Sequence, residues 1–232
     1  MHFLYNMMEV LYIVPAWFFA TSIVLELIFA AVTLAVAYYS LKVYSLCGQR
    51  ESKLFGISFL IMAVSFIIRS VLNIFVTTSI NGEYIRTLSV GRIMVINNFS
   101  VYAYIFLMTL SLMTLAYTTF KVNSSKIYSL LAITSVLILV FAEIKSWAFY
   151  VLSILFLAYV VIHYYREYMD NRTKKKLQVL SAFVLLLISN VVFMKAGQNY
   201  LYFVTGHLLE LASALLVLLS LASVIKYGQK KK

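Results

Sequence analysis

The amino-acid sequence predicts an all-α, polytopic membrane protein with seven transmembrane helices. Three observations lead to this fold class. Of 232 residues, 63% are hydrophobic and only 12% are charged, whereas soluble globular domains are about half apolar and about a quarter charged. Apolar stretches recur along the whole chain, and the basic residues fall in short clusters between them. This composition argues against a water-soluble enzyme, a disordered chain and a small disulfide scaffold.

Seven apolar segments have about the length that a transmembrane helix needs, which is about 20 residues with a range of about 17–25. The expected spans are residues 17–44, 54–78, 93–120, 127–142, 147–165, 177–194 and 200–225. The third contains no charged residue. The fourth is the shortest, and the flanking Lys126 and Lys145 can extend it by reaching toward the lipid headgroups. We expect residues 1–232 to form one transmembrane domain.

The distribution of lysine and arginine predicts the orientation of these spans. Cytoplasmic loops of membrane proteins are enriched in both residue types. Most of the 19 basic residues fall on one side of the predicted membrane: Lys42, Arg50, Lys53, Lys121, Lys126, Arg166, Arg172, Lys174, Lys175, Lys176, Lys226, Lys230, Lys231 and Lys232. We therefore expect the N-terminus outside and the C-terminus inside a multi-pass protein of the cell membrane. Trp17 and Trp147 begin two spans at the outer boundary, as an aromatic belt would.

The net charge of +11 is interpreted as a topology signal. Nucleic acid is not an expected partner because the sequence contains no folded basic module. The expected partner is the lipid bilayer, and the cluster Lys174, Lys175 and Lys176 could also bind anionic lipid headgroups. A protein partner or a second copy of the chain stays open. The single cysteine, Cys47, allows no intrachain disulfide.

The spans could form an internal repeat of three plus one plus three helices. The halves would be residues 10–120 and 146–228, with a linker helix at residues 127–142. In each half a basic loop leads through Lys-Leu, at positions 53–54 and 176–177, into the next span. One linker helix gives both halves the same orientation, so this would be a parallel repeat. Similar composition among apolar helices is the alternative explanation.

The plan resembles that of small sugar transporters and opsins in topology only. Sugar transporters of this plan rely on prolines within their helices, whereas the single proline here, Pro15, precedes the first span. An opsin needs a lysine in the seventh span for the retinal Schiff base, and residues 196–225 contain none. A second resemblance is carried by an aromatic-rich helix end, Ala37-Tyr38-Tyr39-Ser40-Leu41-Lys42-Val43-Tyr44, the turn Gly48-Gln49-Arg50 and the start of the next helix, Phe55-Gly56-Ile57-Ser58-Phe59. Over about a fifth of the chain, this pattern is similar to archaeal multi-helix membrane proteins, including input modules of membrane sensors. The resemblance implies a sensor that signals through a separate partner.

Polar side chains inside the predicted spans gather at one depth. Ionisable residues in a membrane are costly and usually face the interior of the helix bundle. Measured along the helices from their outer ends, Glu26 and Arg69 lie about 13 Å deep, His207 about 10 Å and Glu210 about 15 Å. Asn73, Asn98 and Asn190 lie about 5–8 Å deep. These seven residues form the candidate ligand-binding or ion-binding site, in which we expect Arg69 to contact Glu26 or Glu210.

Two interpretations of this polar set are open. It could be a clasp of ion pairs and hydrogen bonds that ties helices together, or an outward-facing polar site for a small ligand or ion. The second makes the chain a sensor or a transporter. The alternative function is a non-catalytic structural or accessory subunit of a larger membrane complex.

We expect no enzyme, no catalytic residues, no metal site and no cofactor. The chain contains neither His-Glu-x-x-His, nor Gly-x-Ser-x-Gly, nor a glycine-rich phosphate loop, which mark metalloprotease, hydrolase and nucleotide sites. A single His-x-x-Glu occurs, and a di-iron bundle needs two. His163 and His207 differ in depth by about 14 Å, so they cannot ligate one haem.

Overall fold

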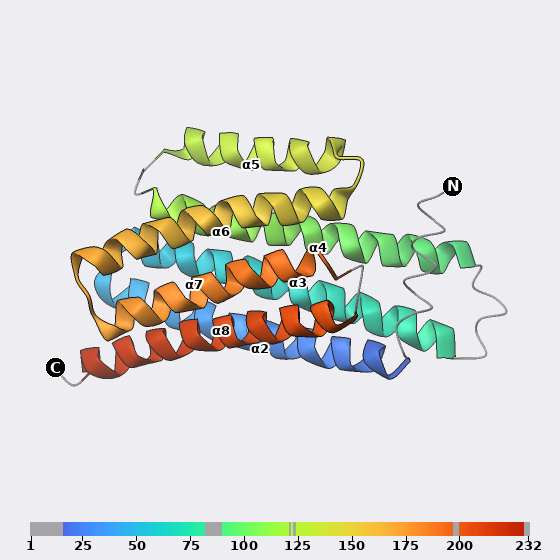
Figure 1. Ribbon diagram of the computed structural model, residues 1–232, viewed down its shortest axis with the longest axis horizontal. Coiled ribbons are helices and arrows are strands. Elements are labelled where there is room, and N and C mark those ends of the chain that lie inside the picture. The colour runs from blue at the N-terminus through green and yellow to red at the C-terminus, as the bar shows by residue number, and fades with distance from the viewer. Residues whose placement is uncertain (1–15, 82–89, 121, 123, 197–199, 230–232) are drawn as a thin grey trace.

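Seven α-helices make up the regular structure of the described residues. The computed structural model describes residues 16–81, 90–120, 122, 124–196 and 200–229. The helices are α2 (Ala16–Cys47), α3 (Arg50–Asn81), α4 (Val90–Thr119), α5 (Ser125–Phe141), α6 (Lys145–Asp170), α7 (Lys174–Phe193) and α8 (Tyr200–Gln229) (Figure 1). Each predicted span overlaps one of these helices over nearly all of its length. The predicted all-α fold with seven helices is confirmed.

Six of the helices are long and apolar enough to cross a membrane, within residues 22–47, 50–75, 95–119, 145–170, 174–193 and 201–223. The chain is therefore a polytopic membrane protein. The seventh, α5, has 17 residues, which gives a length of about 26 Å. The hydrocarbon core of a bilayer is about 30 Å thick. Helix α5 nevertheless runs alongside α6 (Figure 1), in the direction that a short span would take.

Six helices form a closed ring and α5 lies outside it. Helix α2 packs against α3 and α8, α4 against α3 and α6, and α7 against α6 and α8. Among the described elements, helix α5 packs mainly against α4 and α6. The two predicted halves thus each supply three consecutive ring helices, and α5 connects them from the outside. Whether the halves arose by duplication stays a prediction.

Local hydrogen bonds fix both ends of α5. The Tyr117 hydroxyl of α4 donates to the backbone oxygen of Ser124 at 2.9 Å, and the Ser124 side chain accepts from the backbone N–H of Ile127, as an N-cap does. At the other end, the Lys145 ammonium donates to the backbone oxygens of Val140 and Ala142. Lys145, expected to reach toward lipid headgroups, thus caps the last carbonyls of α5.

Buried hydroxyl groups join neighbouring ring helices. Such interhelical bonds are worth about 0.6–2 kcal/mol each in membrane proteins. Each of four serine hydroxyls donates to a backbone oxygen of the adjacent helix: Ser40 to Ser52, Ser111 to Ser58, Ser189 to Gly206 and Ser213 to Ala182. Many large apolar side chains point outward instead, which suits a surface in contact with lipid.

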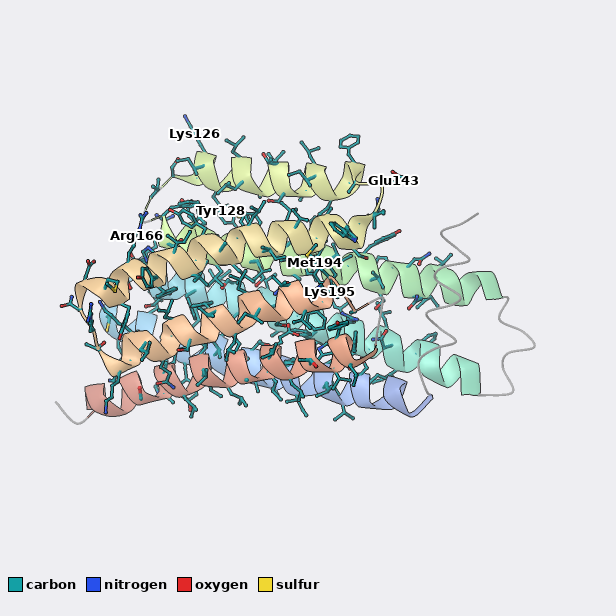
Figure 2. The ribbon with its side chains drawn as sticks, viewed as in Figure 1. Lys126, Tyr128, Glu143, Arg166, Met194 and Lys195 are labelled. Carbon is teal, nitrogen blue, oxygen red and sulfur yellow. The ribbon has the colours of Figure 1, made fainter. Side chains whose placement is uncertain are left out.

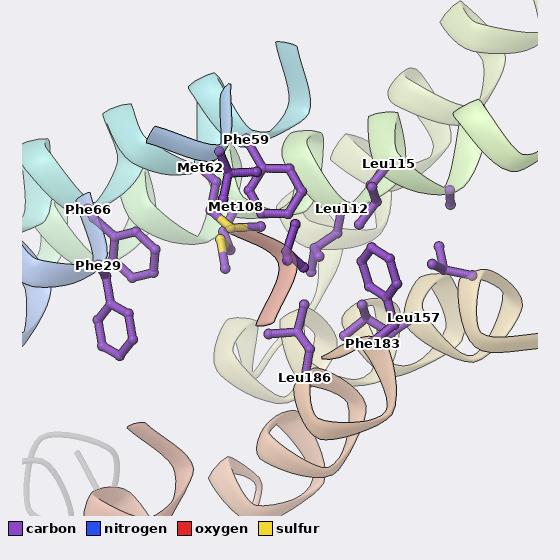
Figure 3. Packing of buried hydrophobic residues seen from close by; sticks show 14 of the residues in the cluster. Phe29, Phe59, Met62, Phe66, Met108, Leu112, Leu115, Leu157, Phe183 and Leu186 are labelled. Atoms are coloured by element: carbon purple, nitrogen blue, oxygen red, sulfur yellow. The ribbon is translucent and has the colours of Figure 1, made fainter. Parts of the chain in front are cut away.

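Bulky apolar side chains pack together inside the ring (Figure 3). We call this set the apolar layer: Phe29, Phe59, Met62, Phe66, Phe183 and Leu186, all buried. Phe66, Met62 and Phe59 follow Arg69 toward the start of α3, where the loop from α2 enters. Leu186 and Phe183 likewise lie between Asn190 and the start of α7. The apolar layer therefore separates the depth of the candidate site from one end of the bundle.

The basic clusters meet at that same end, which we call the basic end. The α2–α3, α4–α5 and α6–α7 connections and the last turn of α8 lie there (Figure 1). Lys126 and Arg166 point from this end, whereas Glu143 and Lys195 lie toward the other (Figure 2). Among the basic residues counted above, the side chains of Lys121, Lys226 and Lys230–Lys232 lie outside the described residues, as does that of Trp17. Assignment of the basic end to the cytoplasm stays a prediction.

Cysteine accessibility in intact cells tests this orientation. In a Cys47→Ser background, Gly82→Cys and Lys145→Cys should react with an impermeant maleimide added outside. Asn171→Cys, in the α6–α7 connection, should react only after the membrane is permeabilised. Labelling of Lys145→Cys from the cytoplasmic side alone would show that the predicted orientation is wrong.

Candidate functional site

A small cavity lies at the centre of the ring, where five of its helices meet. Its volume is about 30 Å³, enough for two or three water molecules, each of which needs about 10–15 Å³ by this measure. The lining residues are Arg69, Tyr104, Met108, Phe149, Tyr150, Asn190, Phe193, Phe203, His207 and Glu210. They come from α3, α4, α6, α7 and α8. The remaining ring helix, α2, reaches the site through Glu26.

Glu26, Arg69 and Asn73 form a clasp between α2 and α3. Arg69 Nε lies 3.0 Å from Glu26 Oε1, and Asn73 Nδ2 donates to both carboxylate oxygens of Glu26 at 3.1 Å. Arg69 and Asn73 are four residues apart, so they share one face of α3. The predicted contact between Arg69 and Glu26 is confirmed. Glu26 is only 1% exposed, but its carboxylate is both charge-balanced and hydrogen-bonded.

Tyr104 holds the Arg69 guanidinium from a second direction. The Arg69 Cζ lies 4.4 Å from the centroid of the Tyr104 ring, a distance at which a cation is attracted to the face of an aromatic ring. Tyr104 packs in turn against Phe66 and Phe149. The contacts with Glu26 and Tyr104 therefore fix the position of the Arg69 side chain. Arg69 belongs to the clasp and also lines the cavity.

Glu210 and His207 have a different environment, although they line the same cavity. They are 6% and 4% exposed, and they lie three residues apart on one face of α8. Glu210 Oε2 is 3.4 Å from His207 Nδ1. Within the described part of the chain, however, Glu210 Oε2 and both His207 ring nitrogens make no hydrogen bond. Buried polar atoms of this kind are rare in native proteins and call for a specific explanation.

Three aromatic rings surround the His207 imidazole. The ring centroids of Phe29, Phe193 and Phe203 lie 5.6, 4.9 and 4.4 Å from that of His207. The preceding residue, Gly206, makes room for one of them, because a Cβ atom there would lie 2.7 Å from the Phe193 ring. The imidazole therefore has apolar neighbours on several sides, with Glu210 as its nearby acid.

The structure brings most of the predicted site residues together. Arg69, Asn190, His207 and Glu210 line the cavity, and Glu26 and Asn73 form the clasp beside it. Asn190 also donates to the backbone oxygen of Leu186 at 2.9 Å.

Asn98 lies apart from this set. It is exposed on α4 and is not a cavity-lining residue. On α4, the residue that lines the cavity at the level of Arg69 is Tyr104. Because Tyr104 follows Asn98 by six residues, the side chains of Asn98 and Tyr104 lie about 120° apart around the helix axis.

The sequence reasoning missed the aromatic wall of the cavity. This wall consists of Tyr104, Met108, Phe149, Tyr150, Phe193 and Phe203, whereas the predicted site contained only ionisable and amide side chains. Tyrosine in a membrane helix is usually interpreted as an interfacial residue. Tyr104 lies 14 residues after Val90, the first residue of α4, too deep for an interfacial belt, and this depth is the signal that could have identified it.

The site has a defined charge balance. Arg69 is paired with Glu26, whereas the basic group beside the Glu210 carboxylate is the His207 imidazole, which is charged only when it is protonated. Among the described residues, no group of three or more His, Cys, Asp or Glu side chains is placed to hold a metal ion.

No protein-family model, curated protein or solved structure matches this chain.

Proposed function

We propose that this chain is a non-catalytic, multi-pass protein of the cell membrane that binds a small ion at the central cavity and acts as a transporter or a sensor. The observation that carries the proposal is the pair Glu210 and His207. Both side chains are buried, both line the cavity, and their facing atoms make no hydrogen bond to the described chain. A bound ion would complete their interactions.

The contrast with Glu26 supports ion binding over a purely structural role. The clasp of Glu26, Arg69 and Asn73 is complete without a ligand, as helix-stabilising polar groups should be. An accessory subunit needs only such satisfied groups. Glu210 Oε2 and the His207 ring nitrogens make no hydrogen bond within the described chain, and a buried carboxylate without a paired cation is costly. A bound ligand would offset this cost.

The size and position of the cavity indicate the class of ligand and its route. A volume of about 30 Å³ suits an ion or a water molecule, whereas pockets for drug-sized molecules have about 300–1,000 Å³. The apolar layer lies between the cavity and the basic end. Access from the opposite end, which is the predicted outer side, is therefore favoured.

Flux and thermal unfolding measured together test the proposal. The full chain is reconstituted in liposomes, and uptake of H⁺, Na⁺ and K⁺ is followed with fluorescent indicators. In parallel, the melting temperature of the purified chain is measured at varied pH and salt. We expect either an ion flux or an ion-dependent melting temperature that Glu210→Gln removes. Glu143→Gln, which changes an exposed glutamate, is the matched control and should behave as the unmodified chain.

Two outcomes would overturn the proposal that the site binds an ion. If the folded chain shows neither flux nor any ion-dependent stability, or if Glu210→Gln responds as the unmodified chain does, the site does not bind an ion. The chain would then be better explained as an accessory subunit.

The cluster Lys174–Lys176 serves as a second control. We propose that these lysines, of which Lys174 and Lys175 are exposed and Lys176 is half-buried, orient the chain and contact anionic headgroups, far from the cavity. Replacement of all three by glutamine should leave the ion response within about threefold, because headgroup attraction acts only near the membrane surface. Loss of the response in a folded triple variant would contradict this assignment.

A further inference from the structure

We infer that the ion is a proton and that it binds reversibly between Glu210 Oε2 and His207 Nδ1. This inference rests on the proposed function and specifies its ligand. The two atoms lie 3.4 Å apart, slightly beyond a normal hydrogen-bond length. Both lack a hydrogen-bond partner in the described chain. When the neutral imidazole carries its hydrogen on Nε2, two acceptors face each other across this gap, and a proton on Glu210 Oε2 supplies the missing donor.

The charged and titratable groups around the pair explain why a proton would be taken up there. They are Glu26 on α2, Arg69 on α3, Tyr104 on α4 and Tyr150 on α6; α7 contributes the neutral Asn190. Arg69 balances Glu26, and both tyrosines are neutral as phenols. With His207 also neutral, Glu210 leaves the site with one net negative charge. Uptake of one proton from water by the Glu210 carboxylate gives a neutral site.

The ligands that the cavity offers favour a proton over a metal cation. Hard cations such as Ca²⁺ are held by about six to eight oxygen ligands. Phe29, Phe193 and Phe203 surround His207 instead, and the positive Arg69 lines the same cavity. A proton needs only one donor and one acceptor, and the cavity volume of about 30 Å³ leaves room for a water molecule to carry it.

Infrared difference spectroscopy tests this inference on the full chain in lipid nanodiscs. A pH titration should produce the carbonyl band of a protonated carboxyl group, and Glu210→Gln should remove it. Glu143→Gln should retain the band. His207→Asn should keep the band but move its titration midpoint by about one pH unit or more, because coupled groups titrate as a pair. Helix content, measured by circular dichroism, verifies that each variant is folded.

Two results would overturn the inference. One is a carbonyl band that persists unchanged in Glu210→Gln, and the other is the absence of a titrating band in the folded, unmodified chain. The inference and the proposed function can fail separately. A flux of Na⁺ or K⁺ without a Glu210 band would retain the transporter and reject the proton. A Glu210 band without flux and without pH-dependent stability would retain the proton site and reject the transporter and the sensor.

Discussion

Replacement of Arg69 by leucine is expected to lower the free energy of unfolding by about 3–5 kcal/mol, the usual cost of removing one partner of a buried ion pair. The reason is the position of Glu26, which is 1% exposed. Without the guanidinium, its carboxylate stays buried with the two hydrogen bonds from Asn73 but no opposite charge. Equilibrium unfolding of the purified chain in mixed micelles, followed by circular dichroism, measures the effect.

Double variants identify which carboxylate, that of Glu26 or that of Glu210, is paired with Arg69. Arg69→Leu combined with Glu26→Gln should recover part of the loss, because the second change removes the uncompensated charge. Arg69→Leu combined with Glu210→Gln should recover less, since the guanidinium contacts Glu26 directly. Arg50→Leu, which changes an exposed arginine, is the control and should have little effect. Equal recovery by the two glutamine changes would contradict the assignment of the clasp to Glu26.

The clasp could be predicted from the sequence because the bilayer imposes a strong rule. A charge inside a span needs a partner, and two residues can pair only when they lie at the same depth. Glu26 and Arg69 lie on helices that run in opposite directions, yet their distances from the outer ends agree. Depth along a helix follows from residue number alone, so this part of the site needed no knowledge of helix packing.

The faces of the helices could not be predicted in the same way. In a soluble helix an apolar stripe marks the buried face, but here lipid and protein core are both apolar. The sequence pattern therefore did not indicate that Tyr104 faces the ring interior on α4 whereas Asn98 is exposed. For the same reason it could not show how α5 packs, although its shortness and its place between the two halves were apparent.

Replacement of Phe183 by alanine is expected to lower the free energy of unfolding by about 2–3 kcal/mol. Phe183 is 0% exposed. Its ring stacks on Tyr164, with centroids 4.9 Å apart, and meets the edge of Phe55. The side chain of phenylalanine exceeds that of alanine by roughly 100 Å³, and a residual cavity costs about 24 cal/mol per Å³. The hydrophobic transfer contribution is small here because lipid tails are as apolar as the protein core. The measurement is the same equilibrium unfolding.

Phe106→Ala on α4 is the matched control for this prediction. Phe106 is 42% exposed, so lipid chains can fill the space that its ring leaves, and no enclosed cavity forms. We expect a loss of about 1 kcal/mol or less, within the range of substitutions away from core features. If Phe106→Ala destabilises the chain as much as Phe183→Ala does, the ring interior and the lipid-facing surface have been assigned to the wrong sides of α4.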